Sequence, residues 1–63
     1  MTRLQIQRLN DALEGLDVGV SAALLRTDPQ AAINQVLRQI GAAMIHDLED
    51  ASVDRAIRAM EAA

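Results

Sequence analysis

The sequence has no cysteine and no aromatic residue, and it contains only one histidine among its 63 residues. A chain without cysteine cannot form a disulfide, and one histidine does not provide the ligands of a structural zinc site. A domain of this length has a small hydrophobic core, which rarely supplies more than about 3–5 kcal/mol of net stability. Because neither a disulfide nor zinc can supplement this core, we expect the chain to oligomerise.

The lack of aromatic residues also limits the composition of the core, which must consist of leucine, isoleucine, valine, methionine and alanine. Such a core is typical of closely packed helices, whereas sheets favour aromatic and β-branched side chains. The sequence therefore predicts an all-α protein. No linker or internal repeat divides residues 1–63, so we expect a single domain.

Positive charge is scarce as well. The formal net charge is −3, and the six basic residues are all arginines spread along the chain. A nucleic-acid surface needs a dense positive stripe, and single-strand binders add aromatic side chains on which bases stack. Neither feature is present, so we do not expect nucleic acid to be the main partner.

The chain also lacks long apolar runs. No uncharged stretch approaches the ~20 apolar residues that cross a bilayer, so we expect no membrane span. Met1–Asn10 carries two arginines and has no apolar run of the kind found in signal peptides. The absence of cysteine is compatible with a reducing compartment, and we expect the protein to be cytoplasmic.

What the sequence does contain is apolar residues at helical spacing. Thr2 and Gln5 match a capping box at the start of a first helix, which we expect over residues 3–25. Apolar residues in this helix recur at intervals of three and four, the spacing of a helix that packs along another helix. They are Ile6, Leu9, Leu13, Leu16, Val20 and Ala23.

Gly15 and Gly19 interrupt this first helix, and two interpretations are open. The pair can mark a close crossing of two helices, although a G-x-x-x-G pattern is informative mainly in membrane segments. Alternatively, the helix breaks near residues 17–19 and Asp17 caps a second short helix. We favour the break, because glycine destabilises a helix interior.

Asp28 and Pro29 mark the start of another helix, because aspartate is a good cap and proline suits the first helical position. We expect this helix over residues 29–48, antiparallel to the first. Its apolar stripe consists of Ile33, Leu37, Ile40, Met44 and Leu48. Gly41 either allows another backbone to come close or is a tolerated weak point.

A short third helix is expected over residues 53–61, after an N-cap at Ser52. It is too short to be stable without docking, either within the chain, across a second copy or on another protein. We take its apolar face, which includes Val53, Ile57 and Met60, as a candidate partner-binding surface.

No residue pattern indicates catalysis, a cofactor, a metal or a small-molecule substrate. Helical spacing places His46 on the exposed side of the second helix, where a bundle can present a phosphate acceptor, but no further motif accompanies it. Asp47, Glu49 and Asp50 would point in different directions on a helix and lack the glycine-containing turn of hard-cation sites. We therefore do not expect an enzyme.

Together, these features predict a helical hairpin with a short third helix. Two apolar stripes exceed what one hairpin can bury, so we expect two copies to dimerise into a four-helix bundle. The expected function is that of a non-catalytic protein–protein interaction module: a small homodimeric adaptor, regulator or docking domain that binds a protein partner. We expect the core and dimer interface at Ile6, Leu9, Leu13, Leu16, Val20, Ile33, Leu37, Ile40 and Met44.

Three other functions remain open. The chain can be the docking or dimerisation segment of a larger multidomain enzyme assembly, which would share the same helical plan. It can be a small helical nucleic-acid-binding regulator, if the arginines gather on one face of the dimer. It can also be a phosphotransfer module, which would require His46 to accept a phosphate group.

The predicted stripe leads to a first test. Leu13→Glu places an unpaired charge among apolar residues, so we expect an unfolded or monomeric chain. Arg58→Glu should leave assembly intact. Molar mass and helicity report both results, and a Leu13→Glu variant that assembles and folds like the wild type would contradict the assignment of the stripe.

Overall fold

The computed structural model describes residues 1–63 and contains four helices and no strand. The helices are α1 (Arg3–Leu16), α2 (Ala22–Thr27), α3 (Pro29–Gln39) and α4 (Asp50–Ala62). The prediction of an all-α protein is confirmed. The helix boundaries differ from the expected ones in three places, and each difference has a local cause.

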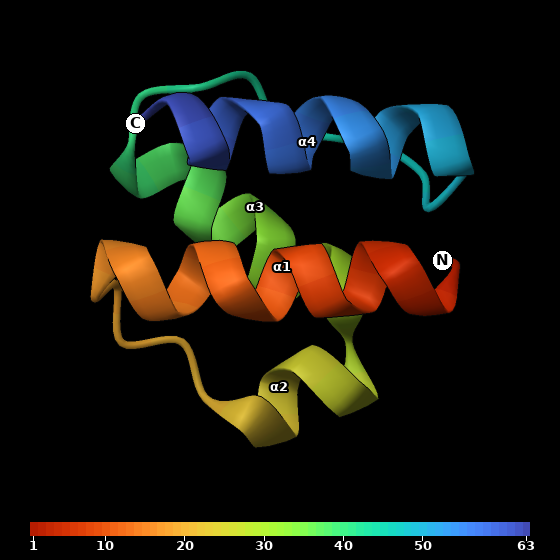
Figure 1. Ribbon diagram of the computed structural model, residues 1–63, viewed down its shortest axis with the longest axis horizontal. Helices are drawn as coiled ribbons and strands as arrows, with labels where there is room; N and C mark the ends of the chain where they lie inside the picture. Colours follow the sequence, from red (N-terminus) through yellow and green to blue (C-terminus); the bar gives the residue numbers. More distant parts are fainter.

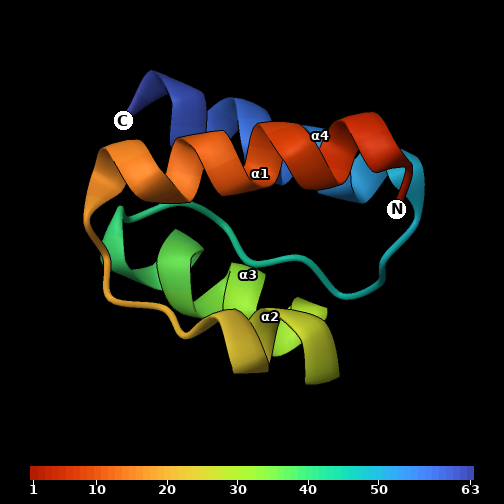
Figure 2. The same ribbon diagram turned by 60° about the horizontal axis from the view of Figure 1, so that its bottom comes forward.

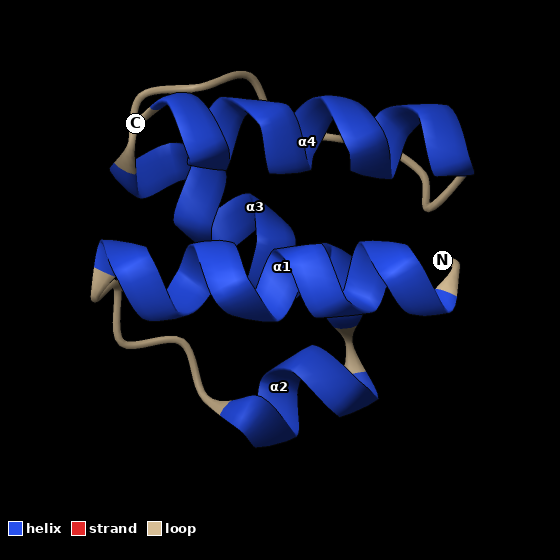
Figure 3. Cartoon of the chain, in the orientation of Figure 1, coloured by secondary structure: helices blue, strands red, loops and turns tan.

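The helices form two layers. In Figure 1, α1 and α4 lie side by side and run in the same direction, with the N-terminus at one end of the pair and the C-terminus at the other. Figure 2 shows that α2 and α3 form a second layer against this pair. The loop between α1 and α2 lies at one edge of the molecule (Figure 3), whereas Figure 2 shows the longer loop between α3 and α4 passing between the two layers.

The hydrophobic core lies between the two layers and contains residues from α1, α3, α4 and the loop after α3. All of its members are aliphatic, as the composition required. They are Leu9, Ile33, Val36, Leu37, Ile45, Val53, Ala56, Ile57 and Met60. Since α4 contributes four of these residues, the third expected helix closes the core within one chain.

The first expected helix ends at Leu16 rather than near residue 25. Asp17 adopts a left-handed conformation with φ of 53°, and Gly19 follows with φ of 70°. Ser21, not Asp17, caps α2, because its hydroxyl accepts a hydrogen bond from the backbone N–H of Leu24 at 3.0 Å. The favoured break is therefore confirmed, although its capping residue was misassigned.

The alternative interpretation of the glycine pair is wrong. Apart from the adjoining backbone, no atom lies within 4 Å of the position that a Cβ would occupy at Gly15 or Gly19. Neither glycine therefore marks a close crossing of two helices.

The second expected helix ends at Gln39 rather than near Leu48. Gly41 follows its C-cap with φ of 75°, a conformation that glycine adopts without the penalty of a Cβ. The N–H of Ala42 donates to the carbonyl of Leu37 at 2.8 Å, and the N–H of Gly41 donates to Arg38 at 3.3 Å. This pair of bonds is a Schellman motif, which ends the helix. Nothing lies within 4 Å of a Cβ at Gly41, so a close backbone approach is also wrong there.

The chain from Gly41 to Glu49 is held in place by Asn34. Its side-chain amide donates to the carbonyl of Ile45 at 2.9 Å, and its oxygen accepts from the N–H of Ile45 at 2.8 Å. Arg55 binds the carbonyls of Ala43 and Met44 at 3.0 and 3.1 Å. These contacts insert Ile45 into the core, where it is 2% exposed, and leave Met44 outside.

The starts of α1 and α4 are joined by Gln5. The capping box is confirmed, since Thr2 and Gln5 exchange hydrogen bonds of 3.0 and 3.1 Å. The Gln5 amide also donates to the carbonyl of Asp50 at 2.9 Å, which places the first turn of α4 beside that of α1. The N–H of Val53 already donates to the carbonyl of Glu49 at 3.0 Å, so α4 begins at Asp50 with Glu49 as its N-cap, and Ser52 lies inside its first turn instead of capping it.

Asn34→Ala should lower the free energy of unfolding by about 1–3 kcal/mol, because it leaves the backbone groups of Ile45 without partners. Gln35→Ala is the matched control, since Gln35 is half-buried on the same helix and makes no side-chain hydrogen bond. Urea unfolding measures both values. Equal losses for the two variants would show that Asn34 does not hold the loop.

Candidate interaction groove between α1 and α2

An apolar groove of about 620 Å³ lies between α1 and the segment formed by α2 and the start of α3. Most of its lining residues are hydrophobic. They are Met1, Ile6, Leu9 and Asn10 on one side and Ala22, Leu25, Arg26 and Pro29 on the other.

One wall of the groove is a face of α1 together with Met1, and the other is a face of α2 together with Pro29 at the start of α3. Leu9 and Asn10 follow Ile6 by three and four residues, so the three side chains share a face of α1. The other wall repeats this spacing from Ala22 to Pro29. The backbone of α2 packs closely on α3 and not on α1, and the groove results from this separation.

The floor of the groove is closed and its rim is exposed. Leu9 is 1% exposed, whereas Ile6 and Met1 at the rim are 43% and 39% exposed. Two other large apolar side chains, Leu4 and Met44, are exposed, and neither lines the groove. The groove is therefore the place where exposed apolar side chains and a concave surface coincide, which is characteristic of binding sites.

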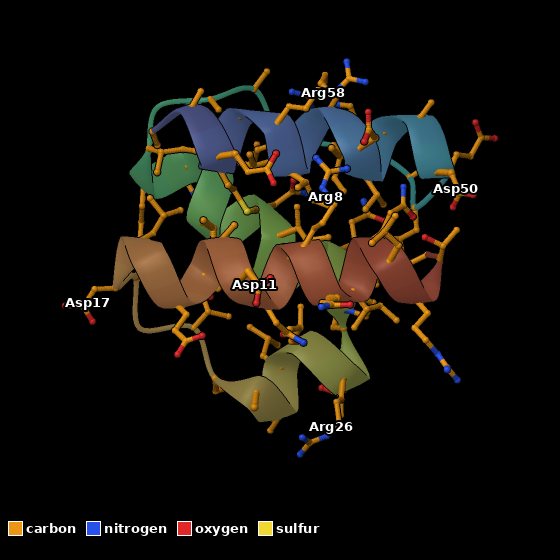
Figure 4. All side chains as sticks on the ribbon, viewed as in Figure 1. Arg8, Asp11, Asp17, Arg26, Asp50 and Arg58 are labelled. Atoms are coloured by element: carbon orange, nitrogen blue, oxygen red, sulfur yellow. The ribbon has the colours of Figure 1, made fainter.

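The charges around the groove are cationic. No acidic residue lines it, and Arg26 and Arg3 form no ion pair within the chain. Figure 4 shows the side chain of Arg26 directed away from α1, whereas Asp11 lies on the outer surface of α1 and Asp17 projects beyond its C-terminal end. Arg26 is thus free to bind an anion that approaches from solvent.

The opposite side of α1 is fastened to α4 by Arg8, which lies between the two helices in Figure 4. Its guanidinium binds Asp54 at 2.9 Å and Glu61 at 2.8 Å. These bonds to Glu61 and Asp54 raise the pKa of Arg8 above its ordinary value. Asp54 also pairs with Arg58, one turn along α4, at 2.8 Å. One side of α1 is therefore held against α4, and its face toward α2 lines the groove.

The residues expected at the dimer interface fall into three groups. Leu9, Ile33 and Leu37 are buried within the single chain. Ile6 and Met44 are exposed. The remaining four are half-buried against the core: Leu13, Leu16, Val20 and Ile40.

The candidate partner-binding residues of the third helix require a correction. Val53 and Ile57 are 0% exposed and Met60 is 1% exposed. They are buried because α4 docks against α1 and α3 of its own chain. These three side chains are consequently not accessible to a partner in the folded protein.

The acidic segment around His46 is a loop and not a helical face. His46 is exposed, but α3 ends before it, so its expected position on a helix is wrong. The Ser52 hydroxyl and the N–H of Glu49 lower the pKa of Asp47 below its ordinary value, the latter through a bond of 3.0 Å. No group of three or more histidine or acidic side chains is placed to hold a metal ion.

Comparisons with known proteins give no relative. The chain matches no protein-family model, no curated protein and no solved structure. None of its helices has the combination of length and hydrophobicity that crossing a membrane requires.

The groove was not predicted, because the sequence does not show where the segment after the break at residues 17–19 lies relative to α1. A signal was nevertheless present: Ser21 is a good cap, and residues 22–29 have an apolar face of their own. Arg8 gave no local signal, since its partners lie on α4, far along the sequence.

Arg8→Ala should lower the melting temperature more than Arg38→Ala, because Arg8 joins two helices and Arg38 is exposed without an ion pair. The difference between the two variants should shrink in 1 M salt, where the Debye length falls to about 3 Å. Thermal unfolding followed by circular dichroism measures both effects. Indistinguishable melting temperatures at low salt would show that the ion pairs do not fix α1.

Proposed function

We propose that this protein is a non-catalytic protein–protein interaction module that forms a homodimer through the groove between α1 and α2. The observation that carries the proposal is the exposed side chain of Ile6 at the rim of an apolar groove. Covering a side chain of this size contributes about 1.5–3 kcal/mol when it is fully exposed beforehand, so covering Ile6 contributes a part of that.

The proposed dimer differs from the one expected from the sequence. Burial of Leu9, Ile33 and Leu37 within one chain removes them from any interface between chains. The interface instead uses Ile6 and the half-buried Leu13 from α1, together with the apolar face of α2. The four-helix arrangement is then built from α1 and α2 of both copies.

A second copy is a suitable occupant because the chain is small. A domain of 63 residues buries a limited core, and no disulfide supplements it. Association of two copies stabilises each of them by mass action, to an extent set by concentration. A homodimer that buries its groove also presents two symmetry-related copies of every remaining surface to a protein partner.

Ile6→Glu tests this function, with Leu4→Glu as its matched control. Both residues lie on α1 and both are exposed, at 43% and 65%, but only Ile6 lines the groove. We expect the wild type to be a dimer and Ile6→Glu to weaken association by roughly 100-fold, since a buried unpaired carboxylate is strongly unfavourable. Leu4→Glu should associate like the wild type.

Light scattering across a dilution series gives the molar masses, and circular dichroism shows whether each variant remains helical. A helical Ile6→Glu chain with the mass of a monomer supports the proposal. A wild type that is monomeric at every concentration, or an Ile6→Glu variant that dimerises normally, would show that the groove does not join two copies.

A further inference from the structure

The face of α1 beside the groove carries opposite charges at its two ends. Residues spaced by three and four along this face form a stripe that begins with a cation and ends with an anion. The stripe consists of Arg3, Ile6, Asn10 and Leu13 in α1, followed by Asp17, the C-cap of the helix. Leu13 is half-buried and the other four are exposed, so this α1 stripe is open to a partner for most of its length.

We propose that the two copies pair through the α1 stripe with their α1 helices antiparallel and Asn10 at the two-fold axis. This inference rests on the proposed function and specifies its partner surface and orientation. Arg3 and Asp17 are equally far from Asn10 in the sequence. Arg3 lies about 10 Å from Asn10 along α1 at a rise of 1.5 Å per residue, and Asp17 directly follows the last turn of α1 as its C-cap. An antiparallel pair centred on Asn10 therefore places Arg3 of each copy level with Asp17 of the other.

Charge favours this orientation over a parallel one. A parallel pair would bring Arg3 against Arg3 and Asp17 against Asp17, and such like-charge contacts oppose association. In the antiparallel pair each cation meets an anion. Arg3, Glu14 and Asp17 form no ion pair within the chain, so all three are available.

The position of the groove also favours antiparallel pairing of the two α1 helices. Its α1 wall is the N-terminal half of the helix, from Ile6 to Asn10, and Arg26 stands on the facing wall. The C-terminal half of a second antiparallel α1 would lie over this groove. Glu14 and Asp17 of the second copy would then approach Arg3 and Arg26, and the groove itself holds no competing acid.

Asn10 suits the centre of such a pair. Its side-chain amide has both donor and acceptor groups, so two copies related by a two-fold axis can exchange hydrogen bonds. A polar residue within an apolar seam fixes the register of paired helices, because any other register leaves the amide without its partner. Ile6 of each copy lies beside Leu13 of the other in this register.

Disulfide trapping tests the orientation directly, because the chain has no cysteine of its own. Asn10→Cys places two thiols at the proposed axis, and we expect mild oxidation to convert this variant to a covalent dimer. Leu4→Cys is the matched control, since Leu4 is 65% exposed on the same helix and lies outside the groove. It should remain uncrosslinked under the same conditions.

Charge reversal gives an independent measurement. Arg3→Glu and Glu14→Arg should each weaken dimerisation by about tenfold, because each change alters two symmetry-related pairs and one exposed ion pair accounts for roughly 1.4- to 5-fold. The double variant should recover most of the wild-type affinity, because the charges are exchanged between the copies. Glu14 is chosen because Asp17 adopts a left-handed conformation at φ of 53° and its replacement would disturb the helix end.

The outcomes separate this inference from the proposed function. A wild type with the mass of a dimer, together with no trapping of Asn10→Cys and no recovery in the double variant, would overturn the antiparallel register and leave the homodimer standing. A wild type that is monomeric at every concentration would overturn both, and the groove would then be assigned to an acidic apolar segment of another protein. Trapping at Asn10 with recovery in the double variant establishes the register.

Discussion

Burial of α4 against α1 and α3 is the interaction on which the rest of this structure depends. The chain has neither disulfides nor aromatic side chains, so its core must be assembled from many aliphatic contacts. α4 contributes Val53, Ile57 and Met60, which complete the core that the preceding helices form only in part. Gln5 and Arg8 secure the same pair of helices through polar bonds at its beginning and along its length. In this arrangement one side of α1 packs against α4, and another side faces the groove.

The path that brings α4 to this position depends on two left-handed turns. Gly19 lies between α1 and α2, and Gly41 follows the end of α3, both with positive φ. Each turn lets the chain change direction after a helix. Asn34 then holds the loop that leads to α4 through its hydrogen bonds to Ile45. The first turn also separates α2 from α1. The groove is therefore a consequence of the same backbone geometry that closes the core.

The proposed function rests on the residues that remain exposed once the core is closed. Ile6 remains at the rim of the groove because Leu9, one turn further along α1, occupies the core instead. Arg3 and Arg26 lie without ion pairs near one end of α1, and Glu14 and Asp17 lie without ion pairs near the other. An apolar centre flanked by separated charges of opposite sign is complementary to its own antiparallel copy. This complementarity supports self-association over binding of a partner with a single sign of charge.

Local signals were sufficient to predict the helical class and the aliphatic core. They also predicted the starts of α1 and α3, because Thr2, Gln5, Asp28 and Pro29 act through neighbouring backbone atoms. The end of α3 was mispredicted because Ile40, Met44 and Leu48 continue its spacing, although Gly41 stops the helix. The candidate groove was not predicted, since it depends on where α2 lies relative to α1. Local patterns are enough to predict that the chain is helical and where its apolar positions lie. They do not predict which apolar residues are buried within the chain and which remain exposed, because that division depends on contacts between α1, α3 and α4 that no local pattern encodes.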